Sequence, residues 1–96
     1  MTDQTNNVAF IVNPEAKTSF HDDGMVILHA GNGCLYKSNI TGARIWRGIE
    51  LKLSLEAIVG EISIEYQIAE AAAREHATRF LIALERNALI QREALS

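Results

Sequence analysis

The side chains that could catalyse a reaction or hold a metal ion are few in this sequence. It contains three histidines and a single cysteine among 96 residues. His21 stands directly before Asp22 and Asp23, and these residue types bind metals. Adjacent residues of a strand and its turn diverge, however, and no second cluster of ligands has the spacing of a zinc site. The aspartates are better explained as part of a turn, and the sequence predicts no metal site.

Two further combinations suggest chemistry without completing it. Cys34 and His29 could meet on neighbouring strands as a nucleophile and its base, but no orienting third group or oxyanion-hole motif accompanies them. The segment Gly31-Asn32-Gly33 is too short to cradle a phosphate, and it lacks the helix and the lysine that would follow. The sequence therefore predicts no catalytic residue, no cofactor and no enzymatic activity.

Short extended segments separated by turns make up the first part of the chain. Residues 16–21, 25–30 and 34–38 have the character of strands, and the turns between them are Asp-Asp-Gly and Gly-Asn-Gly. Three strands joined by short turns predict an antiparallel meander. The run VAFIV at residues 8–12 ends at an Asn-Pro pair and is compatible with a short strand or with an extended arm.

Beyond residue 38 the apolar residues recur at helical spacing. Helices are predicted over residues 40–51, 55–64 and 68–88, and Asn39 and Ser54 are the expected N-caps of the first two. The resulting order of elements is β-β-β-α-α-α. The sequence thus predicts an α+β fold in which a three-stranded antiparallel meander precedes three helices.

Length, composition and charge restrict the class of protein. The 96 residues are 48% apolar and 22% charged, which suits one small domain, and we expect residues 8–96 to form it after a disordered segment at 1–7. No apolar run reaches the roughly 18–20 residues that cross a membrane, and the first residues lack signal-peptide character. A single cysteine suits the reducing cytoplasm. The net charge of −3 disfavours nucleic acid as a partner.

The third predicted helix carries two apolar stripes. At about 100° per residue, the wider stripe is the expected core face, and it contains Ala73, Ala77, Phe80, Leu81, Leu84 and Ala88. A thinner stripe lies about 130° away and contains Ala71, Thr78, Ile82 and Leu89. It either packs within the domain or forms the wall of a groove. Beside the open edge of the last strand of the meander, such a groove is suited to an extended peptide.

The segment DDGMVILHAGNGCLYKSNITGARIW, from Asp22 to Trp46, resembles the PqqD-like family. The shared pattern is an Asp-Gly turn, an aliphatic strand, a Gly turn, an aromatic strand and a helix start. Its most specific residues are Asn39, Thr41, Gly42, Ile45 and Trp46. The resemblance covers about residues 16–90. Ser38, His76 and Ala88 stand where the family usually has leucine, an acidic residue and glycine, which indicates a divergent PqqD-like domain.

The resemblance implies a winged-helix-like domain that binds the leader segment of a ribosomally made precursor peptide. The leader adds as a strand beside the third strand of the meander and against the third helix, and the domain presents the precursor to a modifying enzyme. That enzyme is a radical-SAM protein in pyrroloquinoline quinone synthesis and a leader peptidase in lasso-peptide synthesis. Carried over by position, the peptide-binding residues are Cys34, Leu35, Tyr36, Lys37 and Ser38 on the strand and Ala71, Arg74, Thr78, Ile82 and Glu85 on the helix.

Four of these residues carry more specific expectations. Lys37 and Arg74 are candidates to contact acidic leader residues, although exposed ion pairs contribute only about 0–1 kcal/mol. Tyr36 packs either on a leader side chain or on a partner within the sheet. Ile82→Glu is expected to abolish peptide binding without unfolding the domain, whereas Trp46→Ala is expected to unfold it.

Two other functions compete with peptide binding. Winged helices can bind DNA, and Arg44, Arg47 and Lys52 lie on or just after the first predicted helix, scattered among acidic residues. The same basic residues could equally contact an acidic partner enzyme. A dimerisation module could instead form a homodimer through its exposed strand or by exchange of residues 8–12. The sequence does not identify the precursor, the enzyme that receives it, the oligomeric state or the role of residues 8–12.

Overall fold

The computed structural model describes residues 8–94, so the segment expected to be disordered at 1–7 lies outside the described residues. The strands of the first half are β1 (Val8–Val12), β2 (Ala16–His21), β3 (Gly24–His29) and β4 (Leu35–Asn39). The later elements are α1 (Ile40–Glu50), α2 (Leu55–Tyr66), α3 (Glu70–Arg86) and β5 (Ile90–Ala94). No helix within residues 8–94 is long and apolar enough to cross a membrane.

The predicted meander is present as an antiparallel sheet in the order β2–β3–β4. Gly24 opens β3 with a φ of +152°, and a Cβ at this position would collide with the carbonyl oxygen of Ser38 on β4. Only glycine meets both conditions, because it has no Cβ and adopts positive φ readily. The hairpin that the sequence predicted at the Asp-Gly turn is therefore present, with glycine required at its closing position.

Both predicted N-caps are confirmed. The side chain of Asn39 accepts a hydrogen bond from the N–H of Gly42 at 2.9 Å and so begins α1 directly after β4. Ser54 accepts in the same way from the N–H of Ala57 at 3.2 Å and begins α2. Each cap satisfies one of the backbone donors that the first turn of a helix leaves unpaired. The absence of any linker between β4 and α1 holds the strand against the start of the helix.

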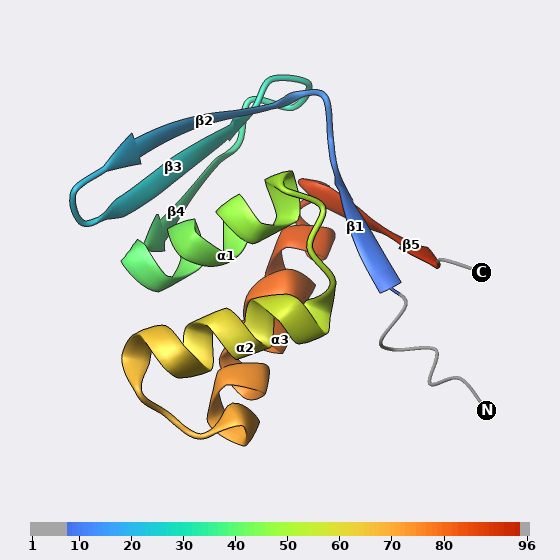
Figure 1. Cartoon of the computed structure of the whole chain (residues 1–96). Helices are drawn as coiled ribbons and strands as arrows, with labels where there is room; N and C mark the ends of the chain where they lie inside the picture. The colour runs from blue at the N-terminus through green and yellow to red at the C-terminus, as the bar shows by residue number, and fades with distance from the viewer. Residues whose placement is uncertain (1–7, 95–96) are drawn as a thin grey trace.

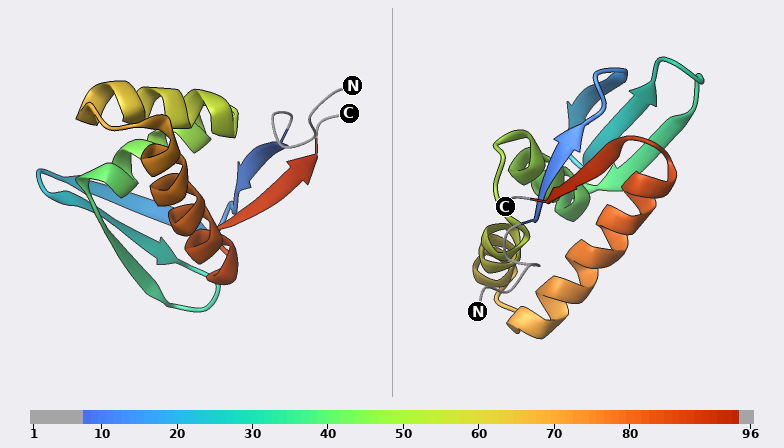
Figure 2. Two further views of the ribbon diagram at one scale, coloured as in Figure 1. Left: turned by 90° about the horizontal axis from the view of Figure 1, so that it is seen from below. Right: turned by 90° about the vertical axis from the view of Figure 1, so that its right-hand side faces the viewer.

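The segment at residues 8–12 forms a strand, and its partner is β5, which the sequence analysis did not predict. Ala88 has a φ of +59° and ends the third helical region, so that Leu89 and Ile90 turn back into the core. Val12 then lies opposite Ile90 in an antiparallel register. Figure 2 shows that this β1–β5 ribbon projects away from the three-stranded sheet. The helix itself is shorter than predicted, ending at residue 86.

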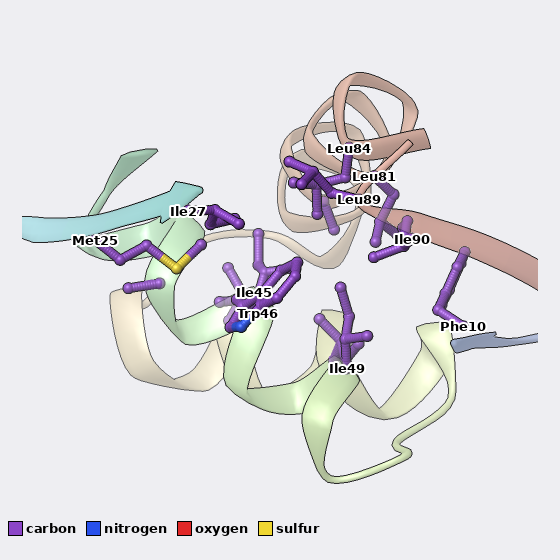
Figure 3. Packing of buried hydrophobic residues seen from close by; sticks show 14 of the residues in the cluster. Phe10, Met25, Ile27, Ile45, Trp46, Ile49, Leu81, Leu84, Leu89 and Ile90 are labelled. Carbon is purple, nitrogen blue, oxygen red and sulfur yellow. The ribbon is translucent and has the colours of Figure 1, made fainter. Parts of the chain in front are cut away.

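The core is built around α1, which lies between the three-stranded sheet and the other two helices (Figure 1). Trp46 on α1 is 0% exposed, as predicted, and Ile45 and Ile49 are buried beside it. Figure 3 shows Met25 and Ile27 reaching this cluster from the sheet, and Leu81, Leu84, Leu89, Ile90 and Phe10 reaching it from the other side. Because α1 contacts every layer, its buried face decides whether the domain folds.

Candidate functional site

The outer edge of β4 is open, since no other strand pairs with it within residues 8–94. His29 donates its backbone N–H to the carbonyl of Cys34 at 2.8 Å, and this bond identifies which opposed residues of β3 and β4 form hydrogen-bonded pairs. Bonded and non-bonded pairs alternate along an antiparallel ladder. The N–H of Tyr36 therefore faces β3, and the N–H groups of Leu35 and Lys37 face the open side. This edge carries unused donors and acceptors that a further strand could bind.

A hollow of about 510 Å³ lies directly beside this edge, between β4, the start of α1, the later part of α2 and one side of α3. We call it the β4–α3 hollow, and it is lined by Tyr36, Asn39, Thr41, Gly42, Ile45, Ile62, Tyr66, Ile68, His76, Arg79, Phe80 and Ala83. The lining is largely apolar and aromatic. The rings of Tyr36 and Phe80 connect the strand to the helix, with centroids 6.1 Å apart and planes tilted by 58°. Apolar lining beside unpaired backbone is the combination that recognises extended peptides.

The polar part of the β4–α3 hollow is provided by a few side chains. His76 and Arg79 line it from α3, and the guanidinium of Arg79 also pairs with Glu75 at 2.7 Å. None of the described residues that line the hollow is acidic. Burial raises the pKa of the Tyr36 phenol, because desolvation disfavours the charged form. Tyr36 is therefore a neutral hydrogen-bonding group at physiological pH.

Four of the five residues predicted on the strand lie in β4 at the open edge, whereas Cys34 lies just before the strand, which runs from Leu35 to Asn39. The four differ in the side to which they turn. Tyr36 lines the β4–α3 hollow, and Ser38, two residues along, is half-buried on the same face of the strand. Cys34, Leu35 and Lys37 are exposed. Leu35 and Lys37 could thus contribute backbone groups to a bound strand, whereas Tyr36 could contribute its side chain.

The five predicted residues of the helix lie outside the lining of the β4–α3 hollow. Arg74 instead forms a two-pronged ion pair with Glu56 of α2, with distances of 2.7 Å. Glu85 pairs with Arg92 of β5 at 3.0 Å. Ala71 and Ile82 are exposed, and Thr78 is half-buried, on the same side of the helix. The predicted stripe thus belongs to the side of α3 that meets α2 and β5.

The helix residues predicted to bind peptide differ from those that line the hollow because of the orientation of α3 about its own axis. At about 100° per residue, the lining residues His76, Arg79 and Ala83 lie on one side of the core face, and the predicted stripe lies on the other. Small or apolar residues occur on both sides, so periodicity alone does not identify the side that faces β4. One signal was available in the sequence, because Phe80 lies at the boundary of the core face and its bulky ring marks the side of the hollow.

Of the groups that suggested chemistry, His29 is engaged in hydrogen bonds and the thiol of Cys34 is not paired with its imidazole. The Nδ1 atom of His29 accepts hydrogen bonds from the N–H groups of Gly31 and Asn32 at 3.1 and 3.3 Å, and so holds the turn before β4. Cys34 is exposed on that turn. Within residues 8–94, no group of three or more His, Cys, Asp or Glu side chains is placed to hold a metal ion. His29 is therefore a structural residue.

The basic residues of α1 that suggested DNA binding also have partners. Arg44 pairs with Glu65 of α2 at 3.4 Å. The guanidinium of Arg47 lies over the ring of Phe20 at 4.7 Å from its centroid, a cation–π contact. These side chains connect α1 to α2 and to β2, and they form no uniformly basic face.

These elements define a winged-helix-like α+β domain with an open groove between its sheet edge and third helix. The family model of coenzyme PQQ synthesis protein D (PqqD) matches residues 24–90, more than half of the chain, and the chain belongs to this family. The resemblance found in the sequence is thus confirmed. No match was found among curated protein sequences.

Two solved structures share the fold. One is TbiB1 in complex with the TbiA(beta) leader peptide, with 27% sequence identity and a TM-score of 0.79 over 84% of this chain and 94% of that chain. The other is a lasso peptide synthetase B1 complexed with the leader peptide, with 23% identity and a TM-score of 0.78 over 85% of this chain and 96% of that one. The first is similar in sequence and fold, and the second shows the fold alone.

Proposed function

We propose that this protein is a non-catalytic adaptor that binds the leader segment of a ribosomally made precursor peptide. The leader adds as a fourth strand to the open edge of β4 and lies against α3. The adaptor then presents the precursor to a modifying enzyme, either a radical-SAM enzyme or a leader peptidase. It works in the cytoplasm, where the exposed thiol of Cys34 stays reduced.

One observation carries this proposal: the unpaired edge of β4 borders the β4–α3 hollow directly. Ladder bonds to Leu35 and Lys37 supply affinity that is independent of the peptide sequence. Alternate side chains of the added strand then enter the hollow and supply selectivity. The comparison with TbiB1, which was solved with a leader peptide, supports the same use of this fold.

The modifying enzyme must reach the precursor beyond the bound segment. Strand addition orders only a short part of the peptide and leaves the rest of the precursor free, so the adaptor needs no reactive group of its own. Its effect is to raise the local concentration of the precursor at the enzyme, as a linked binding module does. The proposal accordingly assigns catalysis to the partner enzyme.

The direct test is an amide NMR titration of the full chain labelled with ¹⁵N. The ligands are synthetic peptides recovered from a randomised twelve-residue phage library, and a random-sequence DNA duplex at low salt serves as the parallel ligand. We expect saturable peptide shifts at residues 34–39 and 76–83 and no saturable shift with the duplex. Failure to recover any peptide, or duplex shifts centred on residues 44–52, would contradict peptide recognition.

A second copy of the chain is the competing occupant of the edge of β4. Size-exclusion chromatography at two concentrations separates the two possibilities. A dimer that dissociates when peptide is added would show that both use this edge, and a dimer unaffected by peptide would place self-association elsewhere.

A further inference from the structure

The β4–α3 hollow has an uneven distribution of charge that goes beyond the general ability to bind a peptide. Its lining contains Arg79 and His76 on α3, and none of the described lining residues is acidic. The whole chain, by contrast, has more acidic than basic residues and a net charge of −3. The described lining of the hollow therefore offers hydrogen-bond donors and no carboxylate, and Glu75, which pairs with Arg79, lies outside that lining.

Arg79 and His76 keep free hydrogen-bonding capacity toward a ligand. The ion pair of Arg79 with Glu75 joins two largely exposed side chains, at 75% and 63% of their full exposure, so it is weak. The pair uses one arm of a guanidinium that has five N–H donors. His76 is exposed and makes no hydrogen bond or ion pair with any other described residue. Both side chains can donate to an oxygen of a bound carboxylate.

The spacing of α3 matches that of an added strand. His76 and Phe80 are one helical turn apart, about 6 Å along the axis. Alternate side chains of a strand are about 6.5 Å apart and enter the hollow on the same face. One inward side chain can therefore pack on Phe80 and Ile45, and the next inward side chain can reach His76 and Arg79.

We propose that the β4–α3 hollow selects peptides with an acidic residue two positions from a large apolar residue, and that His76 and Arg79 are the specificity-determining residues. This inference rests on the proposed function and specifies its ligand. The apolar residue anchors the peptide in the hollow. The carboxylate two positions away receives hydrogen bonds donated by the imidazole and the guanidinium, and its negative charge is attracted to Arg79 in a way that a neutral side chain cannot match and a basic one opposes.

The test uses the randomised phage library with three forms of the full chain. These are the wild type, the double variant His76→Gln with Arg79→Gln, and Lys52→Gln as a control that also removes one positive charge. Lys52 is exposed in the turn after α1 and does not line the hollow. We expect the wild type and the control to enrich Asp or Glu two positions from a large apolar residue. The double variant should enrich the apolar residue alone.

Synthetic peptides make the test quantitative. For the enriched peptide and its Glu→Gln counterpart, measured by isothermal titration calorimetry, we expect the acidic form to bind wild type about three- to tenfold more tightly. The ratio should fall below about twofold in the double variant and weaken with added salt. Circular dichroism checks that the variants fold, and each single substitution is measured in the same way.

The outcomes separate the inference from the proposed function. If wild-type protein recovers peptides without acidic enrichment, or if the double variant keeps the acidic preference, the selectivity assigned to His76 and Arg79 is overturned and peptide binding stands. If wild-type protein recovers no peptide at all, peptide binding and its selectivity fail together.

Discussion

Lys37→Pro tests whether a peptide binds by adding a strand to β4. The N–H of Lys37 faces the open edge, because the adjacent Tyr36 directs its own N–H to β3. Proline removes this N–H, and proline is tolerated in an edge strand where the missing donor faces solvent. The preceding residue is restricted to an extended conformation, which Tyr36 already has within β4. The substitution therefore alters the edge without breaking the bonds to β3.

The expected loss of affinity follows from one missing donor. A bound strand that turns a carbonyl to Lys37 loses its partner there, and a polar group left unpaired in an interface costs about 1–3 kcal/mol. This corresponds to a dissociation constant about 5–150-fold higher. The melting temperature should change by only a few degrees, since the sheet and the core are intact.

The assay is calorimetric titration of the variant with a peptide selected by the wild type. Lys37→Ala is the matched control, because it removes the same side chain and keeps the backbone donor. Ser38→Pro is the opposite control, since the N–H of Ser38 belongs to the β3-facing set and its loss should destabilise the fold. If Lys37→Pro binds within twofold of Lys37→Ala, the peptide does not pair with this edge and the reasoning is refuted.

Three further predictions concern the hollow and the core. Ala83→Glu, inside the hollow, should weaken peptide binding at least tenfold in calorimetry. Ile82→Glu, which the sequence pattern led us to expect would abolish binding, lies outside the lining and should change affinity less than twofold; equal effects of the two substitutions would contradict the assignment of the hollow. Trp46→Ala should cost about 3–5 kcal/mol of unfolding free energy, measured with urea, and a loss below about 1 kcal/mol would show that the indole is not packed. Burial raises the pKa of the Tyr36 phenol, so the stability that its neutral form provides is full below about pH 10 and is lost as the pH rises through the folded-state pKa. In urea titrations at alkaline pH, Tyr36→Phe should therefore lose less stability than the wild type. An unchanged pH profile would show that the alkaline loss of stability comes from another group.

The strands, caps and central core residue were predictable from local signals. The turn after Asp23 needs a glycine, and the sequence has one there. Asn39 and Ser54 accept hydrogen bonds from backbone N–H groups three residues ahead, and Trp46 lies at helical spacing from other apolar residues. Each of these signals operates within a few residues of the chain. The resemblance to the PqqD family depends on the same local stretch, which explains why it was confirmed.

β5 was not predictable in the same way. Its residues Ile90–Ala94 contain two charged side chains and become a strand because β1, at the other end of the chain, provides a pairing partner. The positive φ of Ala88, a conformation usually taken by glycine or asparagine, also depends on the burial of Leu89 and Ile90 that follows it. Such an element exists only once distant segments have been brought together.

From the amino-acid pattern alone, a short meander was predicted to precede three helices, and the last strand of the meander was expected to have an open edge. The side of α3 that faces this edge became known only from the folded structure. The turn between α2 and α3 leads into this helix, with Gln67 in a left-handed conformation and the hydroxyl of Ser63 donating to the carbonyl of Ile68 at 2.7 Å. In α3 the side of Arg74 is paired with Glu56 of α2, and the side of His76 lines the β4–α3 hollow. Both sides of α3 are compatible with burial, so the choice depends on packing between helices, which periodicity within one helix does not contain.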